Sequence, residues 1–267
     1  MFAYFVSGIR SGIRGRSFQV VLILGFLLVG VAYLSAGFSP RHPRTVALDV
    51  GLSGIRITLV LLSLFWIQEL LSKEIERKTI LHSLAYPTTR SSFVIGRYLA
   101  VVALGSLAAL VLGLSLLAAV VAASANYSQD FPVALGLPFW ATLAGLILDM
   151  AVVAALGTMI ATVSTVAIMP LAIGVAFAIG AKALGATLDY LAHGADGDTD
   201  IMNVFGPAVD LVRWVVPDLS RLDWRNWPMY GLAPGGAEVG WAALMAVSYI
   251  AILLLLSIFV FSRREFS

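Results

Sequence analysis

The sequence contains no cysteine, only three histidines, and only 12% charged residues among its 267. The missing cysteines exclude disulfide frameworks, thiolate metal sites and cysteine nucleophiles. The net charge of +2 is too small to indicate a nucleic-acid binder, and the lysines and arginines stand between apolar runs. No Gly-x-x-x-x-Gly-Lys-Ser/Thr loop cradles a nucleotide phosphate, and no nucleophile–base or metal-ligand set is recognisable. We therefore expect no catalytic residues, no metal and no cofactor on this chain.

Apolar residues dominate what is present, at 60% of the chain. Soluble domains average about 45–50% apolar and about 25% charged residues, so lipid is the expected solvent. A bilayer core requires about 20 apolar residues per helix. Six stretches meet or approach that length: 18–38, 55–71, 94–123, 138–161, 164–184 and 239–261. The sequence predicts an all-α membrane protein in which residues 1–267 form one domain with six transmembrane helices.

The distribution of lysine and arginine predicts the orientation of these helices. With the N-terminus inside, ten of these residues fall on the cytoplasmic side and seven on the other. We therefore expect both termini in the cytoplasm and the protein in the cell (inner) membrane. Residues 1–16 form a basic, partly amphipathic lead-in suited to lying along the membrane surface. Residues 185–238 are expected to be an extracytoplasmic segment with helical content and an aromatic cluster of the interfacial type: Trp214, Trp224, Trp227 and Tyr230.

The connection between the second and third predicted spans has the pattern of a short surface helix. Glu74 and Lys78 form a favourable pair four residues apart, and Ile80, Leu81 and Leu84 share one face. Pro87 ends the helix. Such a charged amphipathic rod can dock on a partner and pass its movement to both adjoining spans. The alternative is an ordinary charged cytoplasmic loop.

Several residues in this connection carry a resemblance to a known family. The run Glu76-Arg77-Lys78-Thr79-Ile80, followed by Leu84, Pro87, Arg90 and Gly96-Arg97, resembles the coupling-helix signature of type-2 ABC transporter permeases. The chain end 261–266 is similar to the usual family ending after the sixth span. Residues 216–220 are similar to the family's connection between spans five and six.

The resemblance implies a role for each matching part. Residues 74–86 would be a coupling helix in a cleft of a cytoplasmic ABC ATPase, which would hold the ATP and magnesium. The coupling residues implied are Glu74, Glu76, Arg77, Lys78, Thr79, Leu84, Pro87 and Arg90. Residues 1–16 would be an elbow helix, and the turn 163–165 a second cytoplasmic contact. The permease would pair with itself or a sister subunit over two ATPase subunits. Arg77 and Lys78 make this docking surface more basic than is usual in the family.

Asp149 lies near the middle of the fourth predicted span. A carboxylate there costs roughly 2.5–3.5 kcal/mol on insertion scales, so it should face the bundle interior or a water-filled cavity. We interpret it as a candidate pathway or gating residue; the alternative is a buried carboxyl hydrogen-bonded to a serine or threonine. We expect no basic partner at its depth, because Arg56 is read as an interfacial charge and Lys182 as lying near the outer end of span five.

Alternating acids at Asp196, Asp198 and Asp200 lack the glycine and glutamate spacing of an EF-hand, so we expect a solvated loop there. Two other functions stay open. The first is a non-transporting relay that passes ATPase motion to an extracytoplasmic partner through residues 185–238. The second is a six-span carrier driven by an ion gradient, with Asp149 as its coupling carboxylate. The transported substrate cannot be identified from spans made almost uniformly of leucine, valine, alanine and glycine.

Overall fold

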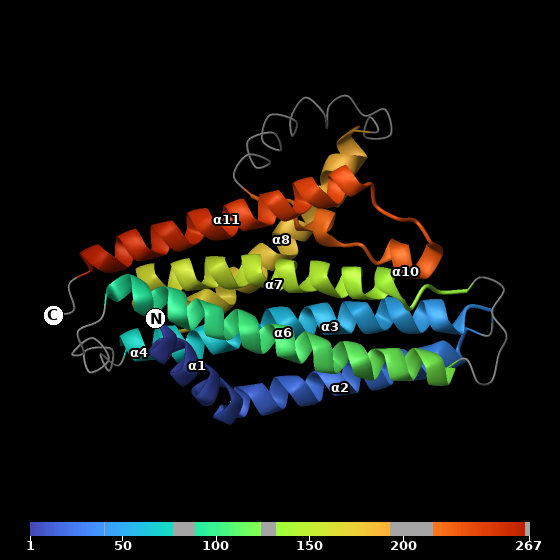
Figure 1. The fold of residues 1–267 in the computed structure, drawn as a ribbon, viewed down its shortest axis with the longest axis horizontal. Coiled ribbons are helices and arrows are strands. Elements are labelled where there is room, and N and C mark those ends of the chain that lie inside the picture. Colours follow the sequence, from blue (N-terminus) through green and yellow to red (C-terminus); the bar gives the residue numbers. More distant parts are fainter. Residues whose placement is uncertain (40, 77–88, 124–131, 193–215, 265–267) are drawn as a thin grey trace.

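The computed structural model describes residues 1–39, 41–76, 89–123, 132–192 and 216–264. Within these ranges the chain is helical and contains no strand, so the predicted all-α class is confirmed (Figure 1). The long helices are α1 Phe2–Arg14, α2 Arg16–Gly37, α3 Pro43–Ile67, α6 Arg90–Ala123, α7 Leu137–Val163, α8 Met169–Ala192 and α11 Gly236–Arg263. The short ones are the π-helix η1 Gln68–Ser72, α4 Lys73–Glu76, the 3-10 helix η3 Leu219–Leu222 and α10 Asn226–Tyr230.

Five stretches of the described chain are long and apolar enough to cross a membrane. They are Phe18–Gly37, Pro43–Glu76, Arg90–Ala123, Leu137–Val163 and Gly236–Arg263. A shorter apolar helix, Met169–Gly185, corresponds to the fifth predicted span. The fold is therefore that of a multi-pass helical membrane protein, while the sixth crossing stays a prediction.

The second long apolar stretch extends well beyond the predicted span 55–71. Its helix begins at Pro43, and η1 and α4 continue it without a break to Glu76. Proline suits the first turn of a helix because it has no N–H to leave unpaired. This longer helix places Arg56 about three and a half turns from the start of α3, far from the helix end.

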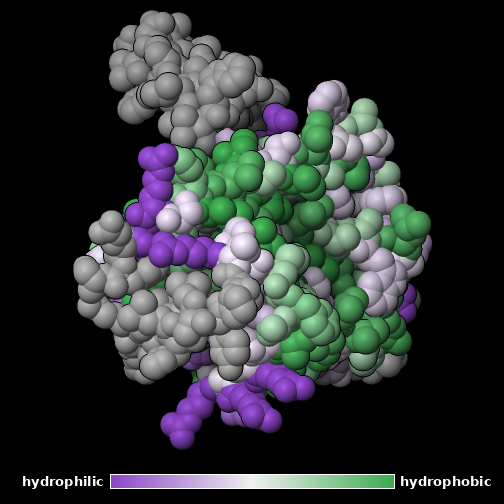
Figure 2. Space-filling view, turned by 60° about the vertical axis from the view of Figure 1, so that its left-hand side comes forward, coloured by the Kyte–Doolittle hydropathy of each residue, from purple (hydrophilic) through white to green (hydrophobic). Residues whose placement is uncertain are grey.

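Burial divides the bundle into inner and outer helices. The most apolar windows of α3 and α7 are 67% and 72% buried, against 28% for α2 and 22% for α11. The inner pair α3 and α7 therefore forms the centre of the core, and α2 and α11 have most of their surface on the outside (Figure 1). Figure 2 shows green apolar side chains over much of the centre and right of the described surface, with the strongly hydrophilic groups gathered mainly at the left and bottom. An outer surface of this kind requires lipid or protein to cover it.

The first helix packs across the bundle through small residues. Gly8 of α1 lies against Ala100, and Gly12 lies against Leu104 and Trp66. The Trp66 indole Nε1 donates a hydrogen bond to the Gly12 carbonyl at 3.2 Å. The helix ends at Gly15, where the backbone becomes extended before α2 begins. Residues 2–14 thus form a separate helix. That this helix is an elbow helix on a membrane surface stays a prediction.

The start of α1, the end of α11 and α4 lie at the same end of the molecule (Figure 1). The opposite end carries α10, the end of α2 and the start of α3. We call the first of these the α4 end and define it by Lys73–Glu76, 90–97, 162–167 and 261–264.

Candidate functional site

At the α4 end, one ion pair joins the two stretches of chain that flank residues 77–88. Glu74 Oε1 accepts a hydrogen bond from Arg97 Nη2 at 2.6 Å, and the Arg97 side chain is only 7% exposed. The Arg97 guanidinium also lies 5.6 Å from the centre of the Phe93 ring. A charge-assisted bond of this kind, largely shielded from water, is stronger than a surface ion pair. The pair fastens α4 to α6 close to where the chain leaves one helix and enters the other.

Arginines at the same end tie the last turn of α11 to its neighbours. Arg90 Nη1 donates to three carbonyl oxygens of the chain end, those of Phe261 at 3.2 Å, Ser262 at 3.2 Å and Arg264 at 2.8 Å. Helix C-termini leave such carbonyls without intrahelical partners, and a guanidinium satisfies them and favours the negative end of the helix dipole. Arg264 Nη1 in turn donates to the carbonyls of Thr162 at 2.8 Å and Ser164 at 3.0 Å. These bonds connect α6, α11 and the end of α7.

The turn after α7 also approaches α4. The Ala167 backbone N–H lies 3.5 Å from Glu76 Oε1, at the outer limit of a hydrogen bond. The structure therefore brings Glu74, Glu76 and Arg90 to one end, beside the turn 163–165 that the resemblance implies as a second cytoplasmic contact. The remaining predicted coupling residues lie outside the described residues: Arg77, Lys78, Thr79, Leu84 and Pro87. Their role stays a prediction.

Asp149 is buried inside the bundle and has a cationic partner. Its residue exposure is 3% and that of Arg56 is 6%. Arg56 Nε lies 3.2 Å from Asp149 Oδ2. The expectation that no basic residue lies at this depth was wrong, because α3 begins at Pro43 and carries Arg56 into its interior. Asp149 faces the protein interior, as its cost in lipid requires.

Asp223 joins this pair to two further cations. Its Oδ2 lies 2.7 Å from Arg56 Nη1 and 3.3 Å from Lys182 Nζ, and its Oδ1 lies 2.9 Å from Arg225 Nε. Arg225 Nη1 also lies 2.9 Å from Asp49 Oδ1. We call the set the central ionic cluster: Asp49, Arg56, Asp149, Lys182, Asp223 and Arg225. It joins α3, α7, α8 and the segment around η3.

Opposite charges also act on Arg225 itself. Burial lowers the pKa of its guanidinium, but hydrogen bonds and charge attraction from Asp223 and Asp49 outweigh burial and raise the pKa above its ordinary value. Arg225 Nη1 donates a further bond to the Ser53 hydroxyl at 2.9 Å. Arg225 is therefore a fixed cation that pins residues 223–225 to α3.

The segment around η3 enters the bundle because its apolar residues and its backbone both find partners there. Leu219 and Leu222 are fully buried, and Asp218 Oδ1 caps η3 by accepting from the Ser220 N–H at 3.0 Å. A Cβ added at Gly145 of α7 would lie 2.5 Å from the Leu222 carbonyl oxygen, so only glycine allows this approach. Irregular backbone at this depth is tolerated where protein surrounds it. We call residues 216–225 the re-entrant segment.

Within the ionic cluster every charged group has an opposite charge within 4 Å, which suits structural pairing and charge movement better than acid–base chemistry. Removing one partner of a buried pair typically costs about 3–5 kcal/mol, because the other charge stays buried without compensation. Sequence reasoning missed the roles of Arg56, Asp223 and Arg225. The available signal was Asp149 itself, since a carboxylate in the middle of a span requires a cation or a hydrogen-bond partner.

The acidic stretch at Asp196–Asp200 lies outside the described residues. Among the described residues, no group of three or more His, Cys, Asp or Glu side chains is placed to hold a metal ion. No protein-family model matches the chain, and no curated protein matches its sequence. Function therefore has to be argued from the α4 end, the ionic cluster and the resemblance in the sequence.

Proposed function

We propose that this chain is the transmembrane permease subunit of a type-2 ABC transporter, moved by a separate cytoplasmic ATPase that binds ATP and magnesium. One observation carries the proposal beyond the resemblance. Both flanks of residues 77–88 are tied into the bundle, through the 2.6 Å bond between Glu74 and Arg97 and through the bonds of Arg90 to the end of α11. A segment held in this way passes displacement on to several helices at once.

The contacts at the α4 end supply separate routes for such a displacement. On one side, α4 continues through η1 into α3, which carries Arg56 of the ionic cluster. On the other side, Arg90 connects α6 to the end of α11, and Arg264 connects that end to α7. An ATPase that pushed on residues 77–88 would therefore act on four helices of the bundle. Short charge-assisted bonds suit this task because they lose strength steeply with distance and angle.

The working unit we propose contains two copies of this permease, or one copy and a sister subunit, over two ATPase subunits. Both termini and residues 77–88 would face the cytoplasm, and six helices would cross the inner membrane. Two features support this orientation: the larger number of lysines and arginines in the segments predicted to be cytoplasmic, and the position of α1 and of the end of α11 at the α4 end (Figure 1).

The test is to tag the chain, purify it from native membranes in mild detergent and identify what accompanies it. We expect an ATPase with a phosphate-binding loop, and ATP hydrolysis that co-purifies with it. Charge reversal at Arg77 or Lys78 should lower both yields severalfold. The matched control is Arg41→Glu, an exposed cation at the opposite end of the bundle. Recovery of wild-type yields in Arg77→Glu and Lys78→Glu, or the lack of any ATPase in the wild-type sample, would refute the coupling role.

A second candidate is the non-transporting relay, which the re-entrant segment favours. Residues 216–225 contact α3, α7 and α8 through Asp223 and Leu222, so movement of the inner helices reaches a connection predicted to be extracytoplasmic. Reconstituted vesicles that contain the ATPase separate the two functions, because a relay hydrolyses ATP without moving solute. A carrier driven by an ion gradient would instead show transport without any ATPase, and Asp149→Asn would abolish its ion coupling.

A further inference from the structure

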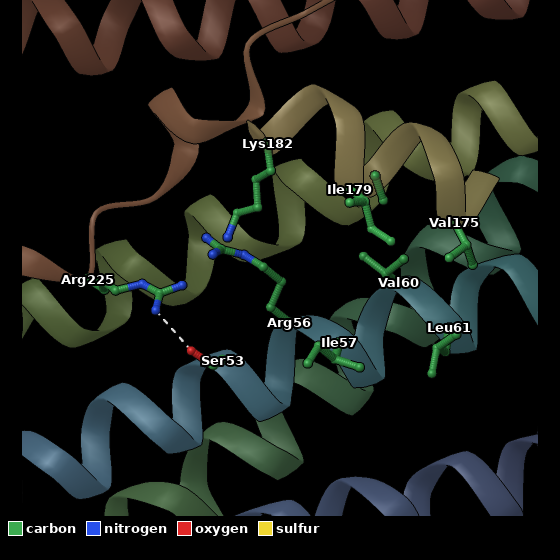
Figure 3. Close-up of a pocket in the computed structure, with 10 residues that line it drawn as sticks. Ser53, Arg56, Ile57, Val60, Leu61, Val175, Ile179, Lys182 and Arg225 are labelled. Carbon is green, nitrogen blue, oxygen red and sulfur yellow. Dashed lines mark hydrogen bonds between the residues drawn. The ribbon is translucent and has the colours of Figure 1, made fainter. Parts of the chain in front are cut away.

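A pocket of about 460 Å³ lies in the groove between α3 and α8. The two helices run in opposite directions. Along the groove, the lining residues of both helices change from charged at one end to apolar at the other. Ser53 and Arg56 of α3 line one end together with Lys182 and Arg225, whereas Val60 and Leu61 of α3 line the other end together with Val175 (Figure 3). The volume is in the range of small-molecule sites. The pocket therefore has a cationic end and an apolar end.

The cationic end contains a buried donor that the ionic cluster does not satisfy. Arg56 uses Nε and Nη1 toward Asp149 and Asp223. Its third nitrogen, Nη2, is buried and has no hydrogen-bond partner among the described residues, and Nε, although 3.2 Å from Asp149 Oδ2, forms no hydrogen bond with them either. Lys182 lies beside it with a side chain that is 30% exposed, and an ammonium carries three N–H donors. A buried donor without an acceptor is costly, so a ligand that supplied an oxygen would be stabilised there.

The balance of charges around the pocket indicates which kind of oxygen-bearing group would bind there. Three cations line the pocket, and the described lining contains no carboxylate. Of the three carboxylates that pair with these cations, Asp149 and Asp223 are 4% and 20% exposed, but the Asp49 side chain is 54% exposed and solvent screens its charge. The cluster contains three cations and three carboxylates, but Asp49 is the most exposed of the six, so its shielded part is weighted toward positive charge. A group with a single negative charge would balance it.

The pocket opens sideways onto the exposed outer surface of the bundle. Two of its lining residues, Ile57 and Ile179, are 54% and 67% exposed, and both lie in the middle of their helices. A ligand can therefore enter from the bilayer with its apolar part. From Arg56 to Leu61 and from Lys182 to Val175 the groove runs roughly 8–11 Å along the two helix axes. This length accommodates the first part of an acyl chain, with the remainder in the bilayer.

We propose that this pocket binds an anionic membrane lipid, with its phosphate at Arg56, Lys182 and Arg225 and one acyl chain along Val60, Leu61 and Val175. The phosphate oxygens accept from Arg56 Nη2 and from Lys182. The apolar groove removes part of the chain from contact with neighbouring lipids and fixes its direction. The proposal does not rest on the ATPase-coupled function, because the site is defined by α3, α8 and the re-entrant segment alone.

The experiment measures lipid binding to the full chain, purified in detergent and freed of lipid, by native mass spectrometry. The probes are short-chain phosphatidylglycerol, phosphatidylcholine with the same chains, and glycerol phosphate without chains. We expect phosphatidylglycerol to bind at least about tenfold more tightly than either other probe, because only it has both the anionic group and the chain. Lys182→Gln should weaken phosphatidylglycerol about tenfold, whereas Lys73→Gln, a half-exposed lysine elsewhere, should leave binding unchanged.

A second variant keeps the charges and fills the groove. Ala178→Leu adds three carbons to the pocket wall, whereas Ala176→Leu adds them to an exposed position on the same helix. We expect only Ala178→Leu to lower phosphatidylglycerol binding. If Lys182→Gln does not elute as a folded protein, Ala178→Leu alone tests whether the lipid occupies this groove. Equal affinity for the two lipids, or binding unaffected by Ala178→Leu, would overturn the proposal. Glycerol phosphate bound as tightly as phosphatidylglycerol would show a soluble-anion site instead of a lipid site.

Discussion

Replacing Arg56 with glutamine is the sharpest test of the ionic cluster. The guanidinium pairs with two carboxylates, at 3.2 Å from Asp149 and 2.7 Å from Asp223. Asp223 keeps Lys182 and Arg225 in the variant, but Asp149 loses the cation beside it with a side chain only 4% exposed. Leaving one buried charge without its partner costs about 3–5 kcal/mol. We therefore expect Arg56→Gln to lower the free energy of unfolding by that amount.

The companion substitution Asp149→Asn should cost less. It removes the carboxylate charge but keeps the shape of the side chain, and Arg56 remains bonded to Asp223. The expected loss is about 1–3 kcal/mol, the penalty of a weakened buried hydrogen bond. When both changes are combined, no carboxylate is left alone at position 149. The loss in the double variant should therefore fall short of the sum of the two single losses by about 0.5–3 kcal/mol.

The measurement is denaturant unfolding in mixed micelles, followed by far-ultraviolet circular dichroism, for the four members of this cycle. In a thermal scan, a loss of about 3–5 kcal/mol corresponds to a decrease in Tm of roughly 6–20 °C for a chain of this size. Arg221→Gln is the control, because that side chain is 51% exposed and its ion pair among the described residues is a local one with Asp218. Its effect should stay within about 1 kcal/mol. Strict additivity of the two cluster substitutions, or equal losses in Arg56→Gln and Arg221→Gln, would refute the pairing.

Two further predictions use other parts of the fold. Gly145→Ala should destabilise the protein by about 1–3 kcal/mol in the same unfolding assay, because the new Cβ would meet a backbone oxygen of the re-entrant segment. Gly180→Ala, inside α8 and with open space around it, should instead stabilise the protein by up to about 1 kcal/mol, and equal effects would contradict the close approach. The natural absence of cysteine allows single-cysteine mapping with a membrane-impermeant maleimide in intact cells. We expect labelling of Arg41→Cys but not of Arg10→Cys or Ser262→Cys; labelling of only one of the last two would mean an odd number of crossings.

The helical class and most helix positions could be predicted because lipid imposes a length and composition that one segment shows by itself. The start of α3 could not be predicted in the same way. Residues 43–54 include Arg44 and Asp49, and a hydropathy pattern treats such charges as interfacial. The structure instead satisfies Arg56 with Asp223, which lies 167 residues away along the chain. Pairings at that separation leave no periodic signal, so the sequence indicates only that Asp149 needs a partner.

The re-entrant segment escaped prediction for a related reason. Leu219 and Leu222 are fully buried, but two leucines in a short polar run do not distinguish a buried 3-10 turn from a surface loop. What holds the segment inside is Gly145, which admits its backbone, and Thr142, whose hydroxyl donates to the Trp224 carbonyl at 3.0 Å. Both lie on α7, and in the sequence they belong to an ordinary apolar span. The coupling residues at the α4 end were proposed from a resemblance, and the structure adds only the bonds of Glu74, Glu76 and Arg90.

The continuous helix from Pro43 to Glu76 connects the ionic cluster, which contains Arg56, to the α4 end, which contains Glu74. Its π-helical turn therefore lies between these two regions. The turn Gln68–Ser72 lies between Arg56 and Glu74, and π-helical turns are rare and frequent at functional sites. Converting such a turn to regular α-helix would rotate the following residues by about 100° relative to the preceding helix. A rotation of that size would carry Glu74 away from Arg97, so the ion pair at 2.6 Å holds the turn in its present register. Under the function proposed above, an ATPase that loosened this pair would change the twist of the helix that holds Arg56, and so act on the ionic cluster without touching it.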